Sequence, residues 1–199
     1  MKKTILAMLA LVLILSVPAF AKNTYYFAGD TVFTIKAGVD FPGFIAFCND
    51  PTRETLTLKD THIKMGGYAS IAYQGYISER FALGGELAYV FNYSHSNLLL
   101  TTVPITARLT YVPVQTGRFD LATSLNLGGA FIRYNEGKYF APFASLTVTP
   151  TFFINENWGL GVEAGIMVTA ELYTKKSNKH DSSAFAGLLP VTLSLSYRH

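Results

Sequence analysis

The sequence predicts an all-β fold, an eight-stranded antiparallel transmembrane β-barrel with up-and-down connections. Residues 81–93 alternate between an apolar, aromatic row and a row of small or polar side chains, which is a β pattern. Charged residues make up only 15% of the chain, against about 25% in soluble domains. No stretch after the first residues suits a membrane-spanning helix. A closed barrel therefore fits best, because hydrocarbon does not tolerate open sheet edges.

A repeat within the sequence indicates the number of strands. Residues 77–91 match residues 154–165, and residues 103–111 resemble residues 189–197. The equivalent positions include Phe81 and Trp158, Gly84 and Gly161, and Glu86 and Glu163. Two copies of a four-strand unit give about eight strands. The alternative is that all barrel strands look alike, and the strand number does not depend on which interpretation holds.

Residues 1–21 have the features of a cleaved signal peptide. A positively charged start and a short apolar run lead to small residues at Ala19 and Ala21. We therefore expect cleavage before Lys22, which leaves residues 22–199 as the outer-membrane β-barrel domain. The formal net charge of the whole chain is only +3. This small positive excess argues against a nucleic-acid partner, which usually requires a strongly basic surface.

Each strand is expected where the alternation runs between two turn signals. The expected strands are residues 32–41, 63–76, 81–93, 100–112, 119–133 and 139–153, followed by two that begin at Trp158 and Leu189. The short turns at 78–80, 113–118 and 155–157 are expected on the periplasmic side. The loops at 42–61, 94–99, 135–138 and 172–183 then face outward.

The alternation predicts a cluster of charges inside the barrel, made of Lys36, Glu86, Arg108 and Glu163. Reflecting one strand onto the next about Asn97 places Glu86 directly opposite Arg108. Because a charge inside a membrane protein is costly unless paired, we expect a salt bridge between them. Glu163 is expected to pair with Lys36 or Arg108. The cluster is either a structural plug that holds the strand register or a charged gate on a narrow water path.

An enzyme is not expected. The candidates for a lipid-modifying site are Ser94-His95-Ser96 and His180-Asp181-Ser182, but a triad is defined by geometry and not by adjacency. Solvated loop residues are the better account, so no catalytic residue is assigned. The sequence has no phosphate-binding loop, zinc-ligand spacing or nucleophile elbow, so no cofactor and no metal site are expected. Cys48 has no second cysteine to pair with.

The chain resembles the small eight-stranded outer-membrane β-barrels of the OmpW and OmpX type. The segments that carry the resemblance are residues 81–86, 103–106 and 158–161, and it extends over essentially the whole mature chain. It implies the outer membrane of a Gram-negative-type (diderm) bacterium, with outer-membrane lipids and the barrel-assembly machinery as partners. Such proteins commonly end on an aromatic residue, whereas here Tyr197 is followed by two further residues.

The first functional hypothesis is a narrow, porin-like channel or transporter for small or hydrophobic molecules, which the OmpW resemblance implies. An apolar opening in the barrel wall would support it. Prolines lack the N–H that a sheet ladder needs, so Pro104, Pro142, Pro150 and Pro190 are where we look for such an opening.

The second hypothesis is a structural, surface-exposed barrel whose outer loops bind host or extracellular molecules. The last loop is basic, and its candidate binding residues are Lys175, Lys176, Lys179 and His180, which favours acidic partners. A lipid-modifying enzyme is the third and weakest hypothesis.

Overall fold

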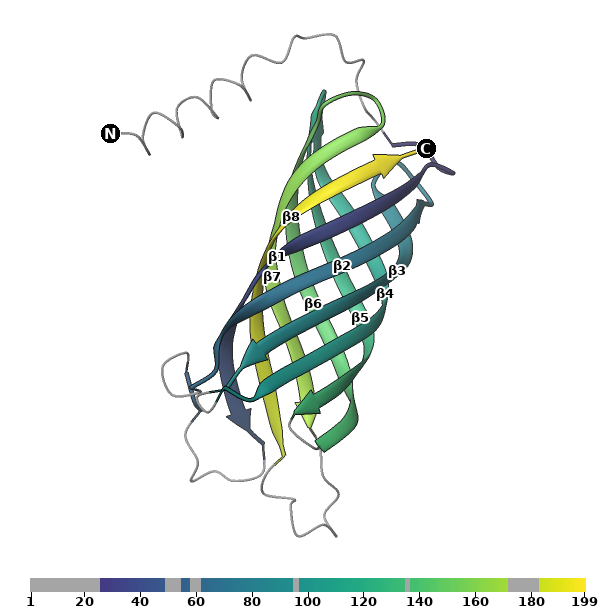
Figure 1. The fold of residues 1–199 in the computed structure, drawn as a ribbon. Helices are drawn as coiled ribbons and strands as arrows, with labels where there is room; N and C mark the ends of the chain where they lie inside the picture. The colour runs from purple at the N-terminus through teal and green to yellow at the C-terminus, as the bar shows by residue number, and fades with distance from the viewer. Residues whose placement is uncertain (1–25, 49–54, 58–61, 95–96, 135–136, 172–182) are drawn as a thin grey trace, which may run out of the picture.

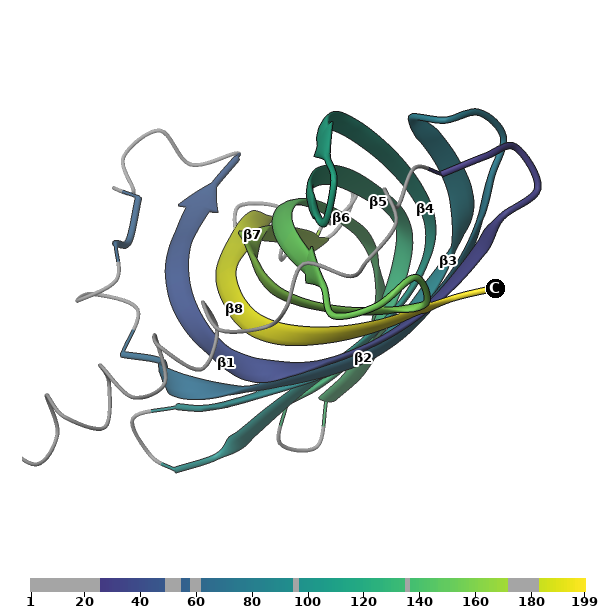
Figure 2. The ribbon, with the colours of Figure 1, turned by 90° about the horizontal axis from the view of Figure 1, so that it is seen from above.

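The strands close into one barrel in the computed structural model, which describes residues 26–48, 55–57, 62–94, 97–134, 137–171 and 183–199. The strands are β1 (Thr31–Phe47), β2 (Lys64–Tyr76), β3 (Phe81–Tyr93), β4 (Leu99–Thr116), β5 (Phe119–Tyr134), β6 (Gly137–Phe153), β7 (Trp158–Glu171) and β8 (Ala184–Arg198). Each strand pairs antiparallel with the next, and β8 pairs with β1. The tilted strands form a continuous wall (Figures 1 and 2). This confirms the predicted fold class.

The wall is apolar outside and polar inside, as β6 illustrates. Thr147 and Thr149 are buried, whereas Leu146 and Val148 between and beside them are 50% and 41% exposed. Successive residues of a strand point to opposite faces, so one row meets lipid and the other fills the lumen. Within the described residues no helix is long and apolar enough to cross a membrane.

Three strands run further than expected. β8 was expected to begin at Leu189 but begins at Ala184, and in β1 and β4 β-bulges carry the strand past a proline. β1 was predicted to end at Phe41, before Pro42-Gly43, but it continues to Phe47 with a register shift against β8 between Pro42 and Phe44. β4 likewise continues past Pro113 to Thr116, with a shift between Tyr111 and Val114. A bulge adds one residue to one strand without ending the pairing, so a proline in the sequence was read wrongly as a strand end.

The register of the β3–β4 hairpin differs from the prediction by two residues. Glu86 lies opposite Thr106, and Arg108 lies opposite Gly84. The centre of the hairpin is therefore one residue before Asn97, which itself adopts a left-handed φ of 58°. A shift of two residues keeps every side chain on its predicted face, so Glu86 and Arg108 both still point into the barrel.

The short turns and the chain ends lie at one end of the barrel. β1 begins and β8 ends there, beside the turns that follow β2, β4 and β6 (Figure 1). Exposed aromatic side chains ring this end. They are Phe81, Tyr111, Phe119, Phe152, Trp158 and Tyr197. Aromatic girdles of this kind sit at the bilayer interface, which fits the periplasmic assignment of this end.

Candidate binding cavity and lumen charge cluster

Four charged side chains from four strands meet inside the barrel and form the lumen charge cluster: Lys36 (β1), Glu86 (β3), Arg108 (β4) and Glu163 (β7). The Lys36 Nζ lies 2.8 Å from Glu86 Oε1 and 2.9 Å from Glu163 Oε1. Arg108 contacts the second oxygen of Glu86 and lies 3.3 Å from Glu163 Oε2. None of the four side chains is more than 7% exposed. Each cation thus bridges both carboxylates.

Neutral side chains complete the hydrogen bonding of the lumen charge cluster. Tyr68 donates to Glu86 at 2.8 Å, and Thr149 donates to Glu163 at 3.0 Å. Arg108 donates to Ser124 at 2.8 Å. Two positive and two negative charges cancel, and buried charges are tolerated when they are paired and hydrogen-bonded in this way. The interior of an eight-stranded barrel is only about as wide as its side chains, and the cluster lies across it.

The structure brings together all four residues of the predicted lumen cluster, with two differences in detail. Glu86 and Arg108 are not directly opposite but meet diagonally across the hairpin. Glu163 contacts both Lys36 and Arg108, whereas the sequence predicted a pair with only one of the two. The predicted loop site of Lys175, Lys176, Lys179 and His180 lies outside the described residues, as does the segment His180-Asp181-Ser182.

A second group of buried side chains across the lumen, at the periplasmic end, was not predicted. The Tyr26 hydroxyl donates to Asp120 Oδ2 at 2.7 Å, and its ring stacks on Tyr76 with centroids 3.9 Å apart. The Arg198 guanidinium lies 5.6 Å from the same ring, and Phe153 packs edge-on against it. Burial, and next to it the charge of Asp120, raises the pKa of Tyr26 well above its usual value. The aromatic run Tyr25-Tyr26-Phe27 before the first strand was the available signal.

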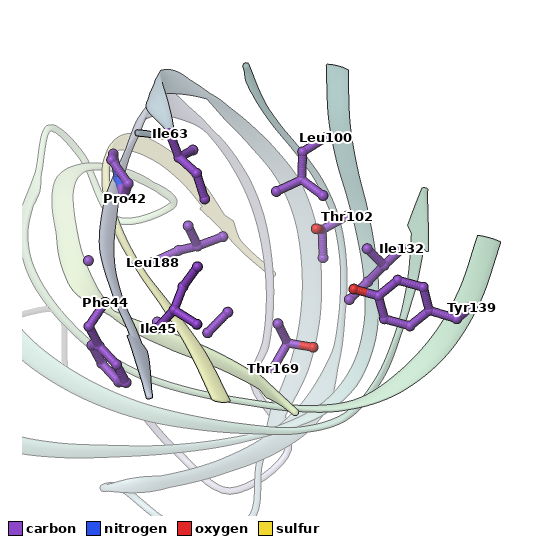
Figure 3. Close-up of a pocket in the computed structure, with 13 residues that line it drawn as sticks. Pro42, Phe44, Ile45, Ile63, Leu100, Thr102, Ile132, Tyr139, Thr169 and Leu188 are labelled. Carbon is purple, nitrogen blue, oxygen red and sulfur yellow. The ribbon is translucent and has the colours of Figure 1, made fainter. Parts of the chain in front are cut away.

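The outer end of the lumen contains a cavity of about 60 Å³, shown in Figure 3. Its walls are mainly apolar. The lining residues are Pro42, Gly43, Phe44, Ile45, Ile63, Leu100, Thr102, Ile132, Tyr139, Thr169, Ala186, Gly187 and Leu188. The space accommodates a few water-sized groups, so a larger guest requires neighbouring side chains to move. We call this space the outer cavity.

The sheet divides beside the outer cavity, between β1 and β2. Their pairing ends at Asp40 and Gly66, although β1 stays paired with β8 as far as Phe47. Beyond Asp40, β1 makes no ladder contact with β2 in the described part of the chain, and its one other bridge joins Ile45 to Leu56. Ile45 and Ile63 flank this division and both line the cavity.

The four prolines singled out in the sequence do not line the outer cavity. Ladder pairs are missing at Pro104 between β3 and β4, at Pro150 between β6 and β7, and at Pro190 between β7 and β8. The register is the same on both sides of each gap, so the strands stay side by side. Pro142 pairs with Gly129 on its β5 side. The proline that lines the cavity is Pro42, at the β1 bulge.

A protein-family model matches residues 16–197 of this chain. No curated protein matches the sequence significantly. Among solved structures, the chain is similar to the outer membrane protein OprG from Pseudomonas aeruginosa, with a TM-score of 0.52, 10% sequence identity and coverage of 89% of this chain and 99% of OprG. At that identity the likeness shows the fold.

Two further structures have the same general form. Neisserial surface protein A aligns with a TM-score of 0.48 and 12% identity over 85% of this chain and 96% of its own. Ail, the attachment invasion locus protein of Yersinia pestis, aligns with a TM-score of 0.48 and 12% identity over 87% of this chain and 100% of its own.

Proposed function

Because this chain belongs to the small eight-stranded outer-membrane β-barrels of the OmpW and OmpX type, we propose that it transports small hydrophobic molecules across the outer leaflet. The observation that carries the proposal is the outer cavity, whose walls are apolar and whose lining comes from six strands and from Ile63. Apolar concave sites with a few polar groups are typical of small-molecule binding.

The proposed route leaves the barrel sideways. A guest in the outer cavity meets the lumen charge cluster below it, and passage would break ion pairs whose separation in a buried site is costly. The part of β1 between its last pair with β2, Asp40–Gly66, and the Ile45–Leu56 bridge offers a shorter path, because β1 makes no ladder hydrogen bonds to β2 there. An apolar guest loses nothing by passing from an apolar cavity into lipid. We propose that the lumen charge cluster acts as a structural plug below this path.

Blocking the outer cavity should slow entry of a hydrophobic probe. Leu188→Trp fills the cavity, since Leu188 lines it and is buried. In cells that express the protein, we expect faster uptake of the fluorescent probe N-phenylnaphthylamine than in cells without it. Leu188→Trp should return the rate to that of cells without the protein.

The matched control is Leu193→Trp on the same strand, because Leu193 is 70% exposed on the lipid face. It should leave uptake unchanged. The folded amount of each variant is checked by heat-shifted gel migration. Equal uptake with and without the wild-type protein, or full uptake by Leu188→Trp, would contradict the transport proposal.

The outer loops support a second role, the binding of acidic host or extracellular molecules. Its support is the basic character of Lys175, Lys176, Lys179 and His180. Replacing the three lysines with Gln should reduce retention on a polyanionic resin at low salt and leave probe uptake unchanged. Unchanged retention would rule this role out.

We also propose that residues 1–21, which lie outside the described residues, are removed as a signal peptide. The barrel-assembly machinery then receives the mature chain. The intact mass of the protein from purified outer membranes tests this directly, because cleavage before Lys22 predicts a single N-terminus. A mass that includes the first 21 residues would refute it.

A further inference from the structure

Asp40 on β1 is a buried carboxylate that no described group satisfies. Its neighbour Val39 is 36% exposed on the lipid face, so Asp40 points into the barrel, where it is 0% exposed. Neither of its carboxylate oxygens has a hydrogen-bond partner among the described residues. Burying a charged carboxylate without a partner is strongly unfavourable, so Asp40 stays buried either as the neutral acid or with a cation bound to it.

The lumen charge cluster does not supply the missing partner. Lys36 lies two inward positions from Asp40 on the same strand, but its Nζ is held by Glu86 and Glu163. Arg108 is held by the same two carboxylates. The cluster is therefore neutral by itself, and it leaves the Asp40 carboxyl without a cationic partner among the described residues.

Asp40 is next to the outer cavity along β1, although it is not itself one of the lining residues. The next inward residue on β1 is Pro42, which lines the cavity together with its β8 partner Leu188 (Figure 3). On the other side, the amide nitrogen of Asn92 lies 3.5 Å from the Asp40 backbone oxygen, and Asn92 pairs with the cavity residue Leu100. Asn92 thus links the Asp40 backbone to a residue that lines the outer cavity.

The chemistry of the combined site defines its ligand. Above the carboxylate, the cavity is apolar except for a few groups such as the hydroxyls of Thr102 and Thr169, and the Thr169 hydroxyl also has no partner among described groups. One carboxylate with two hydroxyls is a poor site for a divalent cation, since Ca²⁺ takes six to eight oxygen ligands. It suits an ammonium group, which presents three N–H donors, on a short apolar tail.

We propose that the outer cavity binds hydrophobic primary ammonium ions, with the ammonium on Asp40 and the tail against the apolar walls. This inference rests on the proposed transport function and names its substrate class. Asn92 is the side chain that must move, and its two hydrogen bonds, at 3.4 and 3.5 Å, are longer than strong ones. The bound ammonium gives the Asp40 carboxylate the partner that the described residues do not supply.

Three six-carbon probes that differ only in their head group test the proposal. Hexylammonium, hexanol and hexanoate are titrated into the full barrel in zwitterionic nanodiscs, with empty nanodiscs as the reference for partitioning. Because hydrogen bonds between charged groups are stronger than those between neutral groups, we expect hexylammonium to bind at least about tenfold more tightly than hexanol. Hexanoate should bind more weakly than either.

Asp40→Asn should reduce hexylammonium binding to the level of hexanol without weakening hexanol binding. The matched control is Asp120→Asn, which removes a buried carboxylate on the far side of the lumen charge cluster and should leave the preference intact. If Asp40→Asn fails to fold, the three probes on the wild-type barrel still decide the matter.

The outcomes separate this inference from the transport proposal. Equal affinity for hexylammonium and hexanol overturns the role of Asp40 while leaving an apolar cavity that binds guests. Binding of none of the three probes, together with unaltered dye uptake in Leu188→Trp, overturns both. Persistence of the preference in Asp40→Asn assigns the ammonium to another group and refutes the inference.

Discussion

Arg108 is the side chain on which the interior depends most. Its guanidinium contacts two carboxylates and one hydroxyl from three different strands. A planar guanidinium offers five N–H donors in a fixed arrangement, which suits contacts with Glu86, Glu163 and Ser124 at once. Its removal leaves Lys36 alone with both carboxylates.

Arg108→Met should lower the free energy of unfolding by about 3–5 kcal/mol, because it leaves buried charge uncompensated. Urea unfolding in lipid vesicles, followed by gel migration, measures the loss. The double variant Glu86→Gln/Arg108→Met should lose less than the sum of the single changes, since it removes a charge of each sign. Leu109→Met, a lipid-facing neighbour, is the control. An unchanged midpoint for Arg108→Met would contradict the pairing.

At the scale of one strand, β3 shows why two adjacent glycines are not equivalent. A Cβ on Gly84 would lie 2.0 Å from the backbone oxygen of Tyr73, whereas on Gly85 its nearest neighbour is 3.5 Å away. Gly84 faces inward and Gly85 faces lipid. The equivalent residue in the sequence repeat, Gly161, is also crowded, with the Ser194 hydroxyl at 2.6 Å. The two matched stretches therefore share a close approach of strands.

Gly84→Ala should therefore destabilise the barrel by about 1–3 kcal/mol, the usual cost of overpacking, because backbone has to move. Gly85→Ala should stay close to the wild type, and this matched pair controls for the loss of glycine flexibility itself. Urea midpoints in vesicles are compared. Equal midpoints for the two variants would show that the β2–β3 spacing is not limiting.

The strands could be predicted from the sequence because alternation survives wherever one face meets lipid and the other meets polar side chains. The parity of that pattern placed Glu86 and Arg108 inside even though the hairpin register was wrong by two residues. The bulges at Pro42 and Pro113 were missed because each proline was read as the end of its strand, so the alternation beyond it was not followed. The outer cavity and the lack of a partner for Asp40 depend on strands that are far apart in the sequence. The sequence does not reveal how residues on such strands are placed relative to one another along the barrel axis.

In the molecule as a whole, two groups of buried side chains lie across the lumen. The lumen charge cluster lies in the middle, and Tyr26, packed on Tyr76 and Phe153, lies at the periplasmic end. The two groups share no residue. One is ionic and the other aromatic, so loss of one leaves the other in place.

We expect the wild-type barrel to show no steady ion current in a planar bilayer. Tyr26→Ala and Arg108→Ala should each remain silent, and only the double variant should conduct. Folding is confirmed beforehand by heat-shifted gel migration. Steady current steps from the wild type, changed by replacing Glu86 or Arg108, would instead identify the lumen charge cluster as a gate.

The join between β1 and β8 has a consequence for the order in which the barrel forms. Every other pair of neighbouring strands is a hairpin, but here Thr31 and His199 exchange backbone hydrogen bonds of 2.9 and 3.0 Å across almost the whole chain. Loop closure costs more entropy as the loop lengthens, so this join forms last. Until then two bare strand edges persist, which invite pairing with other chains. A catalyst that shields both edges would thus speed the rate-limiting closure and suppress aggregation.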